Sequence, residues 1–540
     1  MNDVSCDIAI VGAGLGGLAT GAMLSRLGHR VMVVERHNLP GGYATNFERE
    51  GFTFDVSLHS ADGMVDGAES FETIRACGVA NKIRFLPHRK LYRYKSGDID
   101  LSVRERDLPA YKRQLAELFP AERVNIDALF KEAGRTYADL SGFLTARMPY
   151  ALRMIATPFL YPRILRYGKT TVDQFFSRFT SDERLKAVLA AQWTYYGLPP
   201  RQLAFPYFSY PFTDYLRNGG YSIAGGSQKL SDALVEVIES HGGRVVLSSP
   251  VTAIHVERGR VCGFTSKRTG RVNVERLISD IAPDAVRDLV GVAAFAPKWL
   301  ARLAATPHSI SAFQIYLGLD CPLHELGVAD DECIVFHADN PDLCDQYAQM
   351  QAGQVHTDRT GWSMNFFSNV DPSLAPPAKS TLGLFTLLGS DGWHDLSKPA
   401  YREKKRVLVE ALLVKAERAL PGLRAHIQVC EAGTPNTLRK FTANPMGAIY
   451  GFEQTPQQSG LLHRFRQRYP IRGLYQVGAW TFPGAGYIGT LLSARALVDR
   501  YFGGLRLNRL ADADGALARV ASAQADPLPN ALASLHPTID

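Results

Sequence analysis

Three glycines near the start of the chain have the spacing G-x-G-x-x-G, and they are Gly12, Gly14 and Gly17. They follow an apolar run at residues 7–11, which predicts a buried strand, and they precede a helical pattern over residues 18–27. Without a Cβ the backbone can turn tightly and approach a pyrophosphate, and the third glycine lets the helix pack on the strand. The N–H groups of the helix N-terminus then face the phosphates. The pattern predicts a dinucleotide site that also includes Gly16.

A carboxylate ends the next predicted strand. Residues 30–35 read as a second buried strand, and Glu35 closes it. An acid about 20 residues beyond such glycines is placed to accept hydrogen bonds from a ribose diol. We therefore expect Glu35 to bind the ribose, with Arg36 beside it at the same site.

A second glycine-rich segment lies near the other end of the chain, at residues 475–489. Its residues that we expect at the cofactor are Gly478, Pro483, Gly484, Gly486, Tyr487 and Gly489. A helical pattern follows over residues 489–501, so this helix is expected to point its N-terminus back toward the cofactor. We interpret the two segments as two halves of one cofactor site.

Composition is that of a large globular enzyme. The chain has 540 residues, of which 46% are hydrophobic and 21% charged, and no apolar run reaches the roughly 18 residues of a membrane span. The N-terminus lacks the layout of a secretory signal, so we expect a cytoplasmic protein. The seven cysteines are scattered without a CxxC pair, which predicts neither a metal site nor a redox disulfide. The net charge of +7 is dispersed among 53 acids, which argues against a nucleic-acid partner.

One local segment departs from this dispersed charge. Residues 147–169 carry cationic and no acidic side chains among bulky apolar and aromatic ones. Such a segment suits peripheral contact with a membrane surface, with its arginines at the phosphates. Pro149, Pro158 and Pro162 prevent it from forming one long helix. The alternative is a helical hairpin that caps a substrate pocket, and the sequence leaves both open.

The middle of the chain alternates between helical and strand patterns. Helices are expected over much of residues 107–204 and at 227–241 and 401–420. Strands are expected at 244–248, 277–281, 309–319 and 380–388, with a hairpin at 251–265. This order predicts an α/β fold in which the chain passes between two domains more than once.

Four blocks of the sequence resemble a known family. They are the N-terminal glycine pattern, residues 54–59 after a Gly-Gly-Tyr turn, residues 219–245 and residues 477–494. Together they resemble the phytoene desaturase family of FAD-dependent oxidoreductases, which also contains carotenoid isomerases and retinol saturases. The resemblance extends over nearly the whole chain to about Phe502.

The resemblance implies FAD in a Rossmann-like domain, interwoven with an α+β substrate domain that contains an antiparallel sheet. The implied FAD-binding parts are residues 1–105, 216–290 and 446–505, separated by a helical lid at 106–215 and the substrate domain at 291–445, with a disordered tail at 506–540. In this family the C-terminal helix abuts the flavin, where its positive end stabilises the reduced ring. Gly41 and Gly42 would pass close to the ribityl chain and phosphates, and Val251 would contact the adenine.

Only one dinucleotide fingerprint is present in the sequence, whereas reductases that hold NAD(P)H in a separate domain usually show two. We therefore expect the flavin to exchange electrons directly with an organic substrate. Oxygen, a quinone or a diffusible donor such as NAD(P)H would complete the cycle.

The sequence offers three candidates for catalysis. Hydride transfer needs a substrate carbon held close to the flavin and water excluded, and a conjugated polyene supplies its own activation. We see no trustworthy pair of acids. The candidates are His59, Tyr450 and Glu453. The family shows a glycine where Ser57 stands, which puts the backbone before His59 in doubt. Aromatic residues at 193–196 and 205–210 suit either a pocket for an elongated ligand or ordinary core.

Three functional hypotheses follow. The first is an FAD-dependent oxidoreductase that desaturates, saturates or isomerises a carotenoid-like or retinoid-like polyene. The second is a reductive cyclase or desaturase of a polyene polyketide, such as a precursor of a polycyclic tetramate macrolactam. The third, from another class, is a flavin-bearing membrane-associated protein without turnover.

Overall fold

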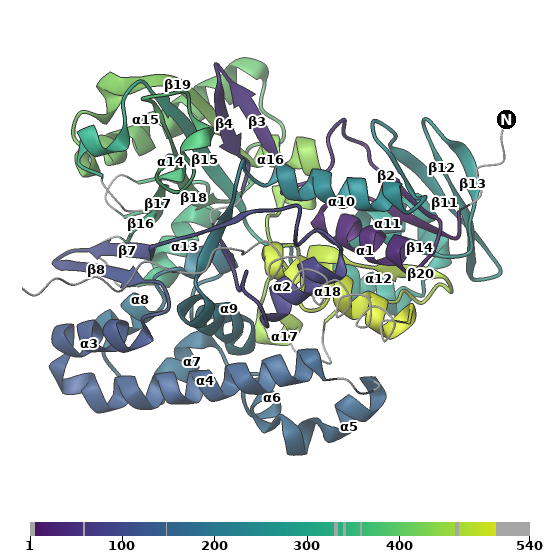
Figure 1. Ribbon diagram of the computed structural model, residues 1–540, viewed down its shortest axis with the longest axis horizontal. Coiled ribbons are helices and arrows are strands. Elements are labelled where there is room, and N and C mark those ends of the chain that lie inside the picture. Colours follow the sequence, from purple (N-terminus) through teal and green to yellow (C-terminus); the bar gives the residue numbers. More distant parts are fainter. Residues whose placement is uncertain are drawn as a thin grey trace, which may run out of the picture.

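The structure is a computed structural model, and it describes residues 6–503 apart from 58–59, 147, 149, 329–332, 338–341, 357–358 and 460–463. In Figure 1 two sheet-containing parts lie side by side, and a group of helices lies below the left-hand part. Strands from the two ends of the chain share one sheet, so the chain passes between the parts repeatedly. The tail predicted at 506–540 lies outside the described residues.

The right-hand part is built on a parallel sheet. Among the described residues its five strands lie in the order β10-β2-β1-β14-β20. Their bounds are β1 (Ile8–Val11), β2 (Val31–Val34), β10 (Arg244–Val246), β14 (Leu277–Ser279) and β20 (Leu474–Gln476). The first four agree with predicted strands to within two residues at each end. Every residue of β1 and β2 is buried because both faces of the sheet are covered.

Helices cover one face of this sheet and a small sheet covers the other. The helices are α1 (Leu15–Arg26), α10 (Gln228–Ser240) and α18 (Gly486–Tyr501), which share a core with β1 and β2. The small sheet consists of β11 (Val251–Glu257), β12 (Arg260–Ser266) and β13 (Gly270–Asn273), and α11 (Pro283–Val290) packs beside it. Both α1 and α18 begin three residues earlier than predicted. Glycine lowers helix propensity, so the pattern alone did not extend into their glycine-rich first turns.

The left-hand part contains a mixed sheet. Within the described part of the chain, seven strands lie in the order β19-β15-β18-β17-β16-β7-β8. Their bounds are β7 (Lys90–Ser96), β8 (Ile99–Arg104), β15 (Ser311–Leu319), β16 (Cys333–Phe336), β17 (Trp362–Asn365), β18 (Ser380–Leu388) and β19 (Ile427–Gly433). The predicted antiparallel arrangement is found everywhere except between β16 and β7, which pair in parallel. Helix α15 (Lys398–Ala419) shares a core with this sheet.

The pairing of β7 with β16 corrects one predicted boundary. The first FAD-binding part is expected to end at residue 105 and so to include residues 90–104. Their strands instead form the edge of the mixed sheet. The hairpin of β3 (Asn46–Arg49) and β4 (Phe52–Asp55) also reaches the left-hand part, because Phe52 and Phe54 pack on Tyr316 of β15. Sequence patterns show a strand but not the sheet that it joins.

Two short strands and their neighbours connect the parts. Strand β9 (Gly220–Ile223) pairs with β5 (Ala61–Asp62) and β6 (Phe85–Pro87), and α2 (Glu69–Ala76) follows β5. The pairing places Asp62 opposite Gly220. The sequence patterns do not predict these short strands.

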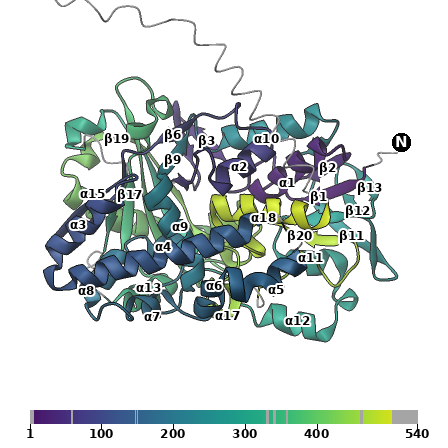
Figure 2. The same cartoon turned by 60° about the horizontal axis from the view of Figure 1, so that its bottom comes forward.

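The predicted helical region at 107–204 forms a layer of its own, with α4 crossing the front in Figure 2 and α5 and α6 below its right-hand end. Its helices are α3 (Leu108–Leu118), α4 (Arg123–Thr145), α5 (Tyr150–Leu160), α6 (Pro162–Tyr167), α7 (Val172–Phe176) and α8 (Glu183–Leu189), and α9 (Phe205–Asn218) follows. The remaining helices are α12 (Pro297–Ala304), α13 (Leu343–Gln351), α14 (Phe367–Val370), α16 (Pro435–Thr442) and α17 (Pro456–Ser459). None of the helices among the described residues is long and apolar enough to cross a membrane.

Candidate active site and cofactor cradle

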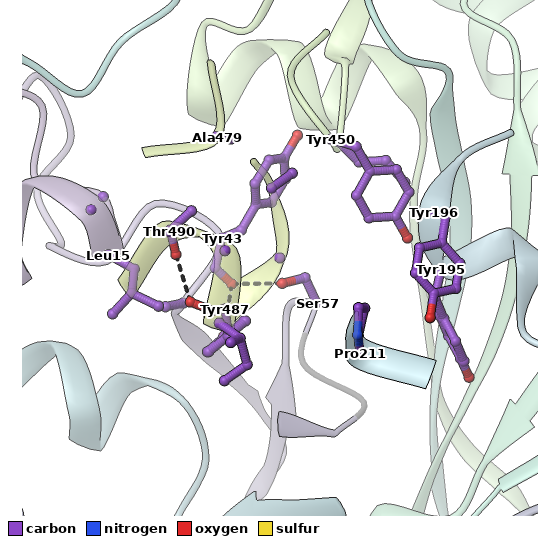
Figure 3. Close-up of a pocket in the computed structure, with 18 of the residues that line it drawn as sticks. Leu15, Tyr43, Ser57, Tyr195, Tyr196, Pro211, Tyr450, Ala479, Tyr487 and Thr490 are labelled. Carbon is purple, nitrogen blue, oxygen red and sulfur yellow. Dashed lines mark hydrogen bonds between the residues drawn. The ribbon is translucent and has the colours of Figure 1, made fainter. Parts of the chain in front are cut away.

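One cavity of about 470 Å³ is lined by both sheet-containing parts and by the helical layer. Figure 3 shows its two ends: Leu15, Tyr43 and Tyr487 lie at one end, and Tyr195 and Tyr196 lie at the other. The first end is made by the glycine-rich loops at the carboxyl edge of the parallel sheet. In open α/β sheets this edge is where ligands bind.

The glycine-rich end has the shape of a cradle. The predicted cofactor residues that line it are Gly12, Gly14, Gly16, Glu35, Gly41, Gly42, Pro483, Gly486, Tyr487 and Gly489. Gly14 and Gly41 form a backbone bridge that joins the first turn to the loop after β2. Nothing lies within 4 Å of the position of a Cβ at Gly486, where φ is +83°, so this turn is open at the start of α18. At these glycines the backbone itself lines the cavity, which is the close approach that a dinucleotide requires.

Glu35, the residue predicted to bind the ribose, lines the cavity, and two backbone N–H groups orient its carboxylate. Its Oε2 accepts a hydrogen bond of 2.8 Å from the N–H of Ala13, and its Oε1 accepts one of 2.7 Å from the N–H of His37. A carboxylate oxygen can accept more than one hydrogen bond, so both keep capacity for hydroxyl donors. The residues present therefore fit an ADP-containing cofactor such as FAD.

Asp280 is a residue of the site that the sequence did not predict. It follows β14 directly, and its carboxyl lines the cavity beneath the first glycine turn. A Cβ at Gly14 would lie 2.5 Å from Asp280 Oδ2, and one at Gly16 would lie 2.7 Å from Oδ1. Burial raises the pKa of Asp280 to about 8, and the charge of Glu35 adds to the rise, while N–H groups of Gly17 and Gly14 oppose it. An acid at the end of a parallel strand was the available signal.

Three predicted glycines act behind the cavity wall and are not among its lining residues. A Cβ at Gly17 would lie 2.4 Å from the carbonyl oxygen of Gly12, so glycine lets α1 pack on β1 as predicted. Gly478 is buried, and a Cβ there would overlap Asp280. Gly484 has a φ of +142°, and a Cβ there would lie 2.7 Å from the Tyr207 ring.

Arg36 and Val251 do not line the cavity either. Arg36 is directed elsewhere, since its Nη2 donates a hydrogen bond of 2.7 Å to the carbonyl oxygen of Lys440. Val251 begins β11 and packs against the core between the parallel sheet and the small sheet. The structure thus gives no support to a direct role for Arg36, and contact of Val251 with the adenine stays a prediction.

A chain of hydrogen bonds connects the end of β4 to α18 through Ser227. Asp55 accepts a hydrogen bond of 2.7 Å from the N–H of Ser227, and Tyr487 donates one of 2.7 Å to the hydroxyl of Ser227. Ser57, which departs from the family pattern, donates to the carbonyl oxygen of Tyr43 at 2.9 Å (Figure 3). This bond fixes the loop at the place where the sequence left the backbone in doubt.

The aromatic residues of 193–210 divide between wall and core. Tyr195, Tyr196, Tyr207 and Tyr210 line the cavity. Trp193, Phe205 and Phe208 are fully buried in the core of the helical layer. Both interpretations of these aromatic patterns are therefore correct for different residues.

The three catalytic candidates have different outcomes. His59 lies outside the described residues. Tyr450 lines the cavity, and its hydroxyl donates to the carbonyl oxygen of Thr194 at 3.2 Å, while burial raises its pKa. Glu453 is half-buried, and burial raises its pKa, but it is not among the lining residues of the cavity. Catalytic roles for all three stay predictions.

One trio of side chains of metal-ligand type comes together outside the cavity among the described residues. It consists of Asp320, Cys321 and His426, and His426 Nδ1 lies 2.9 Å from Asp320 Oδ1. Burial raises the pKa of the Cys321 thiol. The prediction drawn from cysteine spacing stays a prediction.

Comparison with protein families matches residues 15–500 to the family described as flavin containing amine oxidoreductase. The all-trans-retinol 13,14-reductase of Danio rerio is 25% identical over 535 residues, which cover 90% of this chain and 84% of that protein. Prolycopene isomerase 1 of an Oncidium hybrid cultivar is also 25% identical, over 95% of this chain and 87% of its own. A 4,4'-diapophytoene desaturase of a Methylomonas species is 26% identical, over 92% of this chain and 95% of its own.

Solved structures support the fold. An oxidoreductase from Methanosarcina mazei superposes with a TM-score of 0.62 at 18% identity, over 91% of this chain and all of that one. Putrescine oxidase bound to putrescine gives a TM-score of 0.62 at 14% identity, over 92% of this chain and 98% of that one. The predicted combination of a Rossmann-like FAD-binding domain with a second sheet is confirmed, and FAD is the cofactor.

Proposed function

The chain belongs to the family of flavin containing amine oxidoreductases and is an FAD-dependent oxidoreductase, and on this premise we propose that it acts on a long conjugated polyene by hydride transfer. Desaturation, saturation and isomerisation of carotenoid-like or retinoid-like molecules all fall within this proposal. The relatives named for retinol, prolycopene and diapophytoene support it.

The continuity of the cavity carries the proposal. From the glycine cradle it extends, without a break, into a compartment lined by Tyr195, Tyr207, Phe385 and other aromatic side chains. An elongated apolar ligand in this compartment would meet the reactive ring of FAD at one end and exclude water along its length. FAD supplies the acceptor or donor of the hydride.

The residues of the chain have separate parts in this proposal. Glu35 holds the ribose, and the first turn of α1 faces the phosphates. The N-terminus of α18 carries a partial positive charge toward the cavity, which favours an electron-rich ring. Tyr450 closes the wall between the two ends.

Contact with a membrane surface is part of the proposal. Large apolar side chains are exposed on α5 and α6, and they are Leu152, Ile155, Phe159, Leu160 and Leu165. Phe143, Leu144 and Ile164 from the same layer line the cavity. The segment that carries this apolar face, residues 147–169, contains basic and no acidic residues, which suits the boundary between headgroups and acyl chains. A polyene dissolved in lipid would then enter the cavity through this layer.

The proposal is tested with the purified holoenzyme under anaerobic conditions. After reduction of the flavin with dithionite and removal of the excess, retinoids and carotenoids in detergent micelles are added one at a time. We expect one of them to restore the absorbance of oxidised flavin while the polyene loses a double bond, or the oxidised enzyme to bleach as a polyene gains one. Isomerisation would shift the polyene spectrum with no net change in the flavin. If oxygen reoxidises the flavin and no polyene reacts in any of these ways, the proposed function is wrong.

One observation favours a polyene with a polar head, such as the tetramate polyketide of the second hypothesis. The guanidinium of Arg464 lines the cavity, over the ring of Tyr207 at 5.6 Å from its centroid. It donates to the carbonyl oxygens of Pro483 and the Gln454 side chain, and among the described residues no carboxylate forms an ion pair with it. Burial lowers its pKa to about 10, so it remains charged. A cation placed in this way suits an oxyanion, which a hydrocarbon does not have.

A further inference from the structure

The geometry points to a proton-exchanging group in the cavity that the sequence did not reveal: Asp62 and Asp214 form a carboxyl pair that passes one proton to or from the substrate. Asp62 is the member that faces the cavity. The inference rests on the proposed function, because it assigns the proton that accompanies redox chemistry at a carbon–carbon bond.

The two carboxyls reach each other from different elements. Asp62 ends β5, and Asp214 lies in α9 and is 1% exposed. Between them the backbone passes very close: a Cβ at Gly63, where φ is +67°, would lie 2.5 Å from Asp214 Oδ2. Only glycine combines this left-handed conformation with the absence of a side chain. The chain is therefore shaped to bring the two acids together.

Each acid has one oxygen without a donor. Asp214 Oδ1 accepts hydrogen bonds of 2.6 Å from the hydroxyl of Tyr137 and from Nδ2 of Asn218. Asp62 Oδ2 and Asp214 Oδ2 are buried, and neither has a donor in the part of the chain that the structure describes. Asp62 and Asp214 lie close enough that each carboxyl shifts the pKa of the other. Buried acceptor oxygens need a donor, and a proton held by one carboxyl can serve the other, so the two unpartnered atoms mark its place.

Electrostatics assign the first proton to Asp62. Burial raises the pKa of both carboxyls, and the negative charge of Asp214 raises the pKa of Asp62 further. Hydrogen bonds from Tyr137 and Asn218 lower the pKa of Asp214, which favours its charged form. The protonated member is thus the one that lines the cavity.

The surroundings of the pair contain few charges. The titratable and charged groups that face it from η2 (Trp193–Tyr196), α2, α4, α9 and β9 are Glu69, Tyr137, Tyr196, Tyr210, Arg217 and Tyr221. Glu69 accepts hydrogen bonds from Tyr210 and Ser141, and its charge raises the pKa of Asp214. Among the described residues no Lys, Arg or His forms an ion pair with either member of the pair. Without a neutralising cation, two adjacent carboxyls hold a proton at neutral pH.

The proton balance defines what the pair does. When a carbon–carbon single bond becomes a double bond, one carbon loses a hydride with both electrons and its neighbour loses a proton. With bound FAD as the hydride acceptor, the resting proton would pass from Asp62 to Asp214, and Asp62 would take the substrate proton, so that the pair goes from one bound proton to two. In saturation, with reduced FAD as the hydride donor, Asp62 of the doubly protonated pair would give its proton to the neighbouring carbon and recover the one held by Asp214. The charge left on the pair is then stabilised by the proton that the two carboxyls share.

The test compares Asp62→Asn and Asp214→Asn holoenzymes with the wild type. Asp66→Asn is the matched control, because Asp66 is close in sequence but its side chain is 83% exposed. We expect both pair variants to keep their FAD absorbance and to lose turnover of a reactive polyene by about 100-fold or more. The pH dependence set by the pair should disappear with the first variant, and Asp62→Glu should restore part of the rate. The control should behave as the wild type.

A second measurement does not need turnover. Infrared spectra of the resting holoenzyme at neutral pH should contain the band of a protonated carboxylic acid that Asp62→Asn removes. Asp280 contributes a separate band, because its pKa is also raised, and Asp280→Asn identifies it. Absence of a band assigned to Asp62, or turnover within about threefold of the wild type with an unchanged pH profile, would overturn the inference. Failure of the wild type to react with any polyene would instead refute the proposed function. The infrared spectrum would still show whether Asp62 holds a proton.

Discussion

Gly16 of the first glycine-rich segment and Gly478 of the last are in close contact, since a Cβ at Gly16 would lie 2.8 Å from the Cα of Gly478. The carboxyl of Asp280 lies at the same contact, 2.7 Å from that Cβ position. The glycine-rich loops and the end of β14 therefore form one wall of the cofactor site. Any side chain added there must displace backbone, which is more costly than moving another side chain.

Replacing Gly14 with alanine is expected to weaken FAD binding. The added Cβ would lie 2.5 Å from Asp280 Oδ2, which cannot withdraw without leaving its buried position. Overpacking of this kind costs about 1–3 kcal/mol, or about 5- to 150-fold in affinity. The flavin-to-protein ratio after gel filtration and titration of the apoprotein with FAD measure the effect. Gly134→Ala in α4 is the control, because its nearest neighbour would be a side-chain atom at 3.4 Å. Equal affinity for FAD in the Gly14→Ala and Gly134→Ala variants would contradict the assignment of Gly14 to the FAD site.

The raised pKa of Asp280 predicts a dependence of stability on pH. The folded protein holds this proton up to a pKa of about 8, whereas an aspartate in the unfolded chain releases it near its ordinary pKa of 3.8. The stability that Asp280 contributes is therefore complete below 3.8 and is lost as pH rises toward 8. Asp280→Asn keeps an acceptor for the glycine N–H groups and cannot ionise.

The wild type should lose stability relative to Asp280→Asn by up to about 1.4 kcal/mol per pH unit across this window. Thermal unfolding between pH 5 and about 8.5 checks the difference, with Asp66→Asn as the exposed control. A constant difference between wild type and Asp280→Asn across this range would show that the carboxyl is ionised throughout.

The cofactor half of the site could be predicted from the sequence because local patterns determine it. Gly12, Gly14 and Glu35 belong to one strand–turn–helix–strand unit, and their spacing is enough to place them. The sequence did not predict Asp280 at this site, because its position depends on the parallel pairing of β14 with β1, which joins residues far apart in the chain. No comparable local pattern supports Val251 or Arg36, and the cavity does not include them.

The substrate half could not be predicted because its geometry is non-local. Asp62 and Asp214 are far apart in sequence, and their meeting depends on the pairing of β5 with β9, two short strands with no clear pattern. Likewise, nothing in the alternation of β7 shows that its partner is β16. The density of aromatic residues predicted which segment would form the cavity wall. It did not predict which rings face the cavity, because wall residues and core residues are of the same types.

The exposed apolar face of α5 predicts binding to lipid vesicles. Phe159 and Ile155 are 83% and 69% exposed, and each would bury its side chain in the acyl boundary. One such side chain contributes about 1.5–3 kcal/mol when fully buried, so Phe159→Asp should lower the partition into anionic vesicles at least about tenfold. Sedimentation with sucrose-loaded vesicles measures it.

The control for membrane contact is Val124→Asp. Val124 is 79% exposed but lies in the first turn of α4, away from α5. It should leave vesicle binding unchanged. If the two variants lose binding equally, or neither loses it, then α5 does not dock on lipid.

Arg464 predicts a preference between two classes of polyene. A charge-assisted hydrogen bond from a buried guanidinium contributes about 1.5–3 kcal/mol, so Arg464→Gln should raise KM for a polyene with an acidic head by about 10- to 150-fold. For a hydrocarbon polyene the change should be small, because no oxygen faces the guanidinium. Arg464→Lys, which keeps the charge, should retain part of the preference.

Steady-state kinetics measure KM of each Arg464 variant for two polyenes of similar length, one with a carboxylic acid head and one a hydrocarbon. FAD content must be measured in each variant, because Arg464 also donates to the carbonyl oxygen of Pro483 beside the cofactor loop. If KM rises equally for both polyenes while FAD stays bound, the guanidinium shapes the wall and recognises no head group. A selective rise for the acid would instead favour the polar-headed substrate over the hydrocarbon.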